Sequence, residues 1–152
     1  MKSLICVLLI VACAMAACAA LADTVVPVYV PGRAIGGGDL NTYTKGVAGG
    51  VGVNNIGMLI KTFGKVTYIN TTSQFFYVDD GCGRATTLPA PDNCTVYGVR
   101  VSYGGLAAGV PAINPPTINS YVAVTGVIST VLVSSQVQPN VRARRGEDIQ
   151  GF

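Results

Sequence analysis

Alternating and unbroken runs of apolar residues predict that this chain is built from β-strands. Apolar and β-branched residues recur with a period of two or in short continuous runs, and clusters of turn residues separate those runs. The predicted strands cover residues 58–69, 74–78, 95–103, 121–133 and 137–142.

Glycines inside these runs indicate that the strands bend. Gly64, Gly98 and Gly126 interrupt the first, third and fourth strands, at places where the strands of a small barrel must coil. Residues 104–120 contain three prolines, which exclude a long helix and predict a loop. Five strands, three of them bent at a glycine, with a long connection between the third and the fourth predict an all-β fold, a five-stranded Greek-key barrel.

Four blocks of sequence resemble those of OB-fold domains of the nucleic-acid-binding type. The blocks are Phe63-Gly64-Lys65-Val66, Phe75-x-Tyr77-x-Asp79-Asp80-Gly81-x-Gly83, Gly98-Val99-Arg100-Val101 and Tyr121-Val122-x-Val124-Thr125-Gly126. With the Asn-Asn-Ile-Gly lead-in at residues 54–57, they are similar to OB-fold domains found in secreted bacterial proteins of undefined function. The resemblance covers residues 54–145, and it implies an OB-fold barrel with a Gly-rich N-terminal extension.

The N-terminus predicts export. Lys2, the apolar run at residues 4–11 and the small-x-small site Ala20-Leu21-Ala22 have the form of a secretory signal peptide, and the apolar run is too short for a stable membrane span. We therefore expect a secreted, extracellular or periplasmic protein. Processing at Cys13 or Cys18 is the alternative, and it would leave a lipid anchor on the new terminal cysteine.

The chain then divides into four parts. Residues 1–22 are the signal peptide, 23–55 an extended Gly-rich leader, 56–145 the barrel and 146–152 a polar tail. Export would remove Lys2, which leaves nine basic residues against seven acidic ones and a net charge of +2. A charge this small does not indicate a partner bound through net charge alone.

Two cysteines remain after residue 22, and in an oxidising compartment they predict a disulfide. Cys82 and Cys94 bracket a short polar segment, and closing that loop would stabilise the fold by roughly 3 kcal/mol. The chain has no His, and the spacing is not Cys-x-x-Cys, so no metal site and no cofactor are expected.

Alternation along the second and third predicted strands indicates a binding face. If Phe76 and Val78 point inward, then Phe75 and Tyr77 point outward beside Arg100. OB-folds bind extended ligands on this face through stacked aromatic rings and cationic side chains. The predicted ligand-binding residues are Phe75, Tyr77, Arg100, Tyr68 and Lys65. The alternative is that the Gly-rich leader, residues 32–55, covers these rings.

These features favour a secreted, non-enzymatic module over an enzyme. Without His, a Ser or Cys nucleophile would need a Lys as its base, and no Ser-x-x-Lys pattern is present after residue 22. The expected partner is an oligosaccharide or a single-stranded nucleic acid. The alternative is a structural cell-surface or matrix protein that self-associates by adding its extended residues 23–31 to a neighbour's sheet.

Overall fold

A computed structural model describes residues 25–152 and shows a mostly β structure. The predicted signal peptide, with Cys13 and Cys18, lies outside these residues. The described strands are β1 (Val28–Tyr29), β2 (Leu59–Asn70), β3 (Phe75–Asp79), β4 (Ala85–Thr87), β5 (Thr95–Tyr97), β6 (Val99–Ser102), β7 (Tyr121–Val133), β8 (Gln136–Arg142) and β9 (Ile149–Gly151), with 3₁₀ turns η1 (Gly32–Ala34) and η2 (Gly146–Asp148).

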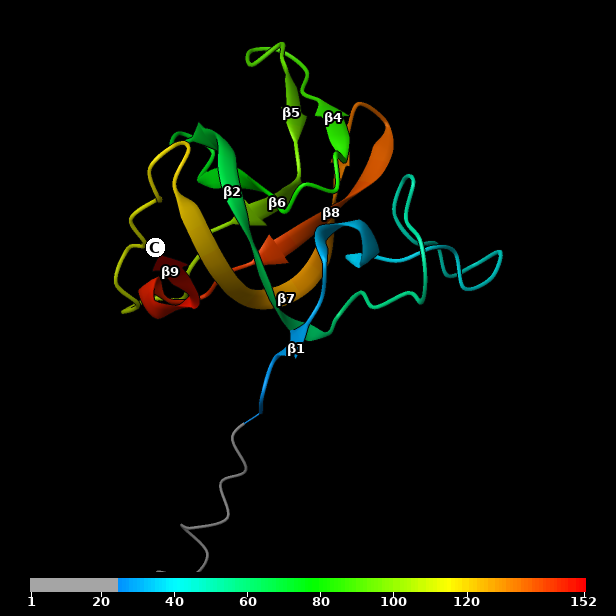
Figure 1. Ribbon diagram of the computed structural model, residues 1–152, viewed down its shortest axis with the longest axis horizontal. Coiled ribbons are helices and arrows are strands. Elements are labelled where there is room, and N and C mark those ends of the chain that lie inside the picture. The colour runs from blue at the N-terminus through cyan, green and yellow to red at the C-terminus, as the bar shows by residue number, and fades with distance from the viewer. Residues whose placement is uncertain (1–24) are drawn as a thin grey trace, which may run out of the picture.

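One mixed sheet contains seven of these strands (Figure 1). Its order is β1-β2-β3-β6-β8-β7-β9, and β7 also pairs with the first half of β2, from Leu59 to Lys65. β6 and β8 are parallel, whereas β2 with β3, β3 with β6, and β7 with β8 are antiparallel. All five strands predicted from the apolar runs are therefore present as β-structure.

The predicted strand at residues 95–103 divides at Gly98 into two strands with different partners. β5 pairs with β4 in a separate two-stranded hairpin, whereas β6 pairs with β3 and β8. Gly98 has φ of 102°, and a Cβ there would collide with the carbonyl of Val78. Only glycine combines this backbone angle with such a close approach to a neighbouring strand.

The main core follows the predicted alternation. Its side chains come from the inward positions of five strands and include Ile60, Val66, Phe76, Val78, Val99, Val101, Val122, Val124, Ile128 and Val141. A second, smaller cluster lies on the opposite side of β3, where the hairpin β4–β5 packs over it. That cluster consists of Phe75, Tyr77, Leu88, Val96 and Val133. Figure 1 shows the hairpin standing above the seven-stranded sheet.

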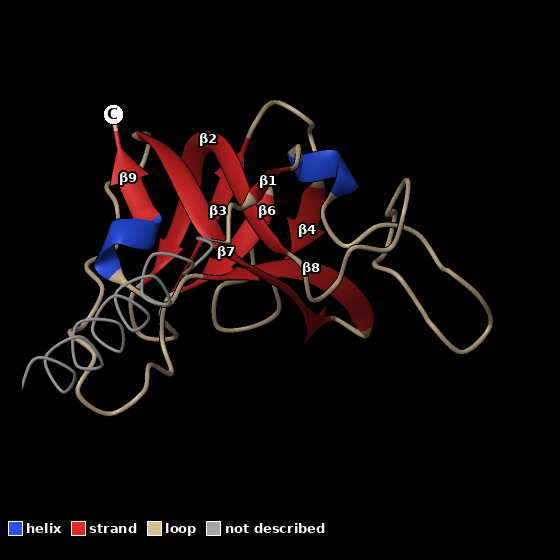
Figure 2. Cartoon of the chain, turned by 90° about the horizontal axis from the view of Figure 1, so that it is seen from below, coloured by secondary structure: helices blue, strands red, loops and turns tan. Residues whose placement is uncertain are grey.

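The predicted Gly-rich leader and the predicted polar tail both make ordered contacts with the rest of the protein. Most of residues 36–58 is irregular and extends to one side (Figures 1 and 2), yet Val47 within this segment is buried, as is Ile35 just before it. The predicted polar tail forms η2 and then β9, which pairs with Val122 to Val124 of β7. Within residues 25–152, the structure has no helix of the length and apolarity needed to cross a membrane.

The prediction of a disulfide is wrong in this structure, because Cys82 and Cys94 are both free thiols. Cys94 lies opposite Leu88 near the tip of the hairpin, where the Leu88 N–H donates to the Cys94 carbonyl. Cys82 precedes β4 at the other end of that hairpin. A disulfide needs the two Cα atoms to lie within about 4.4–6.8 Å of each other. The strand β4 lies between the position of Cys82 and the hairpin tip near Cys94, and its length keeps the two thiols apart.

Candidate functional site

The structure brings four of the five predicted binding residues together. The ring centroids of Phe75 and Tyr77 lie 6.1 Å apart, and that of Tyr68 lies 6.1 Å from Phe75 and 6.4 Å from Tyr77. The Arg100 guanidinium carbon lies 3.9 Å from the centre of the Phe75 ring, which is a cation–π contact. The expected aromatic and cationic platform therefore exists as a cluster.

This cluster is covered, and its cover is not the predicted one. Phe75 is 5% exposed and Tyr77 is 1% exposed. The covering side chains are Leu88 and Val96 of the hairpin β4–β5 and Val133 at the end of β7, rather than residues 32–55. Because the hairpin buries both rings, they do not form an open stacking surface.

The electrostatics of the cluster also reflect burial. Burial raises the pKa of Tyr77 and lowers that of Arg100. Burial, and to a smaller extent the nearby Asp92 carboxylate, raises the pKa of Tyr68 to about 12. The Tyr77 hydroxyl and the Arg100 Nε are buried without a hydrogen-bond partner among the described residues. Burial beneath the hairpin therefore sets the electrostatics of this cluster.

Lys65, the fifth predicted residue, points to the same outer side of the sheet as Tyr77 but lies outside the covered cluster. It is opposite Asp79 of β3 on one side and Tyr121 of β7 on the other. Lys61, Phe63 and Lys65 alternate along β2 and share the outward face with Tyr121. We call the surface formed by Lys61, Phe63, Lys65, Tyr121 and Phe152 the aromatic face.

Three aromatic rings are in contact and open to solvent on the aromatic face. The centroids of Phe63 and Tyr121 lie 5.9 Å apart at an interplanar angle of 15°, and Phe152 meets Phe63 edge-on at 5.8 Å. Phe63, Tyr121 and Phe152 are 38%, 50% and 81% exposed. The Lys61 ammonium donates to the Gln150 side-chain oxygen at 3.1 Å. Contiguous exposed apolar groups, unlike scattered single ones, are typical of interaction surfaces, so the aromatic face is a candidate site.

The sequence analysis did not predict Phe63, Tyr121 and Phe152 as candidate site residues, although part of the signal was present in the sequence. The outward positions of β2 read Lys-x-Phe-x-Lys, which places a large aromatic residue between two lysines on the solvent side. The place of Phe152 beside Phe63 could not be predicted, because residues 146–152 were expected to form a tail, whereas β9 pairs with β7. The Phe152 N–H donates to the carbonyl of Tyr121 at 3.0 Å.

The acidic turn after β3 has a structural role. One ligand atom from each of Asp79, Asp80 and Cys82 lies within 4.8 Å of the others. The two Asp80 oxygens, however, accept hydrogen bonds from the backbone N–H of Gly32 at 2.7 Å and of Cys82 at 3.1 Å. The Asp79 carboxylate accepts one from the Gly81 N–H at 3.2 Å. The carboxylates thus close the turn and attach η1 to the sheet.

The Asp80 contacts predict a stability that depends on pH. Partial burial raises the pKa of Asp80, but backbone hydrogen bonds from Gly32 and Cys82 outweigh burial and lower it from the ordinary value of 3.8. The stabilisation is therefore complete above that value and is lost as the pH falls through the lower, folded-state pKa. We expect Asp80→Asn to reduce the free energy of unfolding by on the order of 1 kcal/mol at pH 7, since the group is partly exposed.

Urea unfolding between pH 2 and pH 7 measures this difference. The free energies of Asp80→Asn and of the unsubstituted protein should converge as the pH falls from the ordinary pKa of the carboxyl through its lower, folded-state pKa. Glu147→Gln is the control, because the Glu147–Arg145 ion pair is exposed and should contribute little. A difference for Asp80→Asn that does not change with pH would contradict the assignment.

The chain has no match among protein-family models, curated proteins or solved structures.

Proposed function

We propose that this chain is an exported, non-enzymatic module with an OB-type barrel that binds an extended polymer across its aromatic face. The pairing order β2-β3-β6-β8-β7, with β7 returning to β2, supports the barrel. The parallel pairing of β6 with β8 supports the Greek-key connection, since the long segment between β6 and β7 allows β8 to enter beside β6. The signal-like residues 1–22 support export.

The observation that carries this proposal is the exposed contact among Phe63, Tyr121 and Phe152. Buried rings stabilise a fold, but exposed rings in mutual contact leave apolar area in water that a ligand would cover. The three rings belong to β2, β7 and the residue after β9, so a ligand lying across them would cross neighbouring strands. A polymer offers successive ring-shaped units, each of which can pack on one of these aromatic side chains.

An oligosaccharide fits the aromatic face better than a single-stranded nucleic acid. Sugar rings present apolar faces that pack on aromatic side chains without requiring charge. A nucleic acid would bring several phosphates, and the face supplies only Lys61 and Lys65, of which Lys61 already contacts Gln150. Two phosphate contacts would give a salt slope of only about −1.4 for a single strand.

Self-assembly through the extended N-terminal segment is less well supported. Val28 and Tyr29 pair in parallel with Ile60 and Lys61 of the same chain. Two residues of the stretch expected to add to a neighbouring sheet are therefore already paired within the chain.

A glycan and oligonucleotide array, followed by calorimetric titration of the best glycan, tests the proposal with residues 23–152. Tyr121→Ala and Phe63→Ala should each lower the affinity about tenfold or more, because truncating an anchoring ring has this effect in binding sites. Tyr43→Ala is the matched control, since Tyr43 is exposed in the Gly-rich segment away from the face.

Salt separates the two polymer classes. An oligosaccharide affinity should be nearly constant between 50 and 200 mM salt, whereas an oligonucleotide affinity should fall about sevenfold with two phosphate contacts. Binding only to oligonucleotides would replace the oligosaccharide with a nucleic acid. An affinity unchanged by both Phe63→Ala and Tyr121→Ala would remove the aromatic face as the site.

A further inference from the structure

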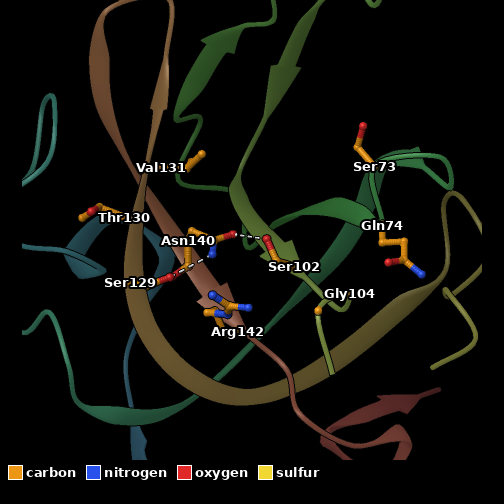
Figure 3. Close-up of a pocket in the computed structure, with 10 residues that line it drawn as sticks. Ser73, Gln74, Ser102, Gly104, Ser129, Thr130, Val131, Asn140 and Arg142 are labelled. Carbon is orange, nitrogen blue, oxygen red and sulfur yellow. Dashed lines mark hydrogen bonds between the residues drawn. The ribbon is translucent and has the colours of Figure 1, made fainter. Parts of the chain in front are cut away.

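A polar groove lies on the outer side of β6, β8 and β7, beyond the edge of the hairpin that covers Phe75 and Tyr77 (Figure 3). Its volume is about 360 Å³, near the lower end of the range for ligand pockets, which suits a ligand about the size of one ring. The lining comprises Ser73, Gln74, Ser102, Ser129, Asn140 and Arg142, together with Gly104, Gly105, Thr130 and Val131. It shares no residue with the aromatic face.

The floor of the groove is a preorganised hydrogen-bond network around the buried Asn140 amide (Figure 3). The Ser102 hydroxyl donates to the Asn140 Oδ1 at 2.7 Å, and the Asn140 Nδ2 donates to the Ser129 hydroxyl oxygen at 2.9 Å. The Ser129 hydroxyl in turn donates to the Asn140 backbone carbonyl at 3.2 Å. Because both serine protons are used, their oxygens remain as acceptors for hydroxyl groups of a ligand.

Arg142 supplies a positive charge to the groove. Ion pairs within residues 25–152 join Lys45 to Asp39 and Arg145 to Glu147, so Arg142 has no carboxylate partner there. Within the described residues, no acidic side chain lines the groove. An unpaired guanidinium in a cleft presents a planar fork of donors that matches a carboxylate.

The wall opposite the strands is held in place by backbone geometry. Gln74 has φ of 54°, a left-handed conformation that is uncommon for a residue other than glycine, and its carbonyl accepts from the Tyr103 N–H at 3.0 Å. Its side chain packs so closely on Gly104 that a Cβ there would collide with it. This arrangement places the Gln74 amide at the groove, where its donors and acceptor match hydroxyl groups.

We propose that this groove binds a carboxylate-bearing sugar unit. The Arg142 guanidinium pairs with the carboxylate, while Ser102, Ser129 and Gln74 hydrogen-bond to ring hydroxyls. The cation selects for a negative charge, and the uncharged hydroxyl and amide groups select for a polyhydroxylated ring over a bare anion. The proposal does not depend on ligand binding at the aromatic face.

Calorimetry and ¹H–¹⁵N NMR with glucuronate, glucose, acetate and inorganic phosphate test this selectivity. Glucuronate should bind about tenfold or more tightly than each of the other three probes. It should also shift the side-chain amide signals of Asn140 and Gln74. Equal binding of glucose would overturn the role of the carboxylate, and equal binding of phosphate or acetate would overturn the role of the ring.

Substitutions at Arg142 test the position of the charge. Arg142→Gln should lower the affinity for glucuronate about tenfold, and Arg142→Lys should restore only part of it, since lysine lacks the planar fork. Arg144→Gln is the matched control, because Arg144 is also exposed, carries the same charge and does not line the groove. An equal loss with Arg144→Gln, or none with Arg142→Gln, would overturn the proposal. Loss of glucuronate binding with Phe63→Ala would place that ligand on the aromatic face instead.

Discussion

Replacing Tyr77 with alanine is expected to lower the free energy of unfolding by about 3–5 kcal/mol, the cost typical of truncating a buried aromatic side chain. Tyr77 is 1% exposed and packs between Phe75 and Tyr68 beneath the hairpin β4–β5. Removal of the ring would leave a cavity that a sheet on one side and a hairpin on the other cannot easily close. Urea unfolding monitored by circular dichroism measures the loss.

Tyr77→Phe is the matched control for this substitution. The Tyr77 hydroxyl is buried without a hydrogen-bond partner within the described part of the chain, so its removal relieves a desolvation cost. We expect the phenylalanine variant to be as stable as the unsubstituted protein or more stable by up to about 1 kcal/mol. A mild effect of Tyr77→Ala would show that the hairpin does not close over the ring in solution.

Gly98→Ala is expected to destabilise the protein by about 2–5 kcal/mol, because two separate costs combine. A residue with a Cβ at φ of 102° loses roughly 1–2 kcal/mol in backbone strain. The Cβ would also strike the Val78 carbonyl, and forcing extra volume into such a contact costs about 1–3 kcal/mol. The same position turns the chain from the hairpin into β6, so both pairings would be disturbed.

Gly109→Ala separates the two costs. Gly109 also has a positive φ, of 85°, but a Cβ there meets no atom within 4 Å. Its substitution should therefore show only the backbone strain of about 1–2 kcal/mol. Equal losses for Gly98→Ala and Gly109→Ala, measured by urea unfolding, would mean that the close approach to Val78 does not matter.

The irregularity within β2 shows where reasoning from alternation fails. Lys65 and Tyr68 are three positions apart, so a regular strand would place them on opposite faces. The register with β3 shifts between Val66 and Tyr68, and this bulge turns Tyr68 outward to face Tyr77. Such a shift depends on how two strands pair, and the composition of β2 alone does not reveal it.

The pattern of apolar residues alone determined the positions of five strands, the inward set of side chains and the glycines at the bends, because these follow from the period of the backbone and from local sterics. Tertiary structure decided which surface stays open. It placed the hairpin β4–β5 over Phe75 and Tyr77, separated Cys82 from Cys94, and brought Phe152 to Phe63 from the far end of the chain. Those outcomes depend on the free energy gained when distant segments bury apolar area against each other. That free energy is a property of the pair of segments, so the sequence of either segment alone does not determine it.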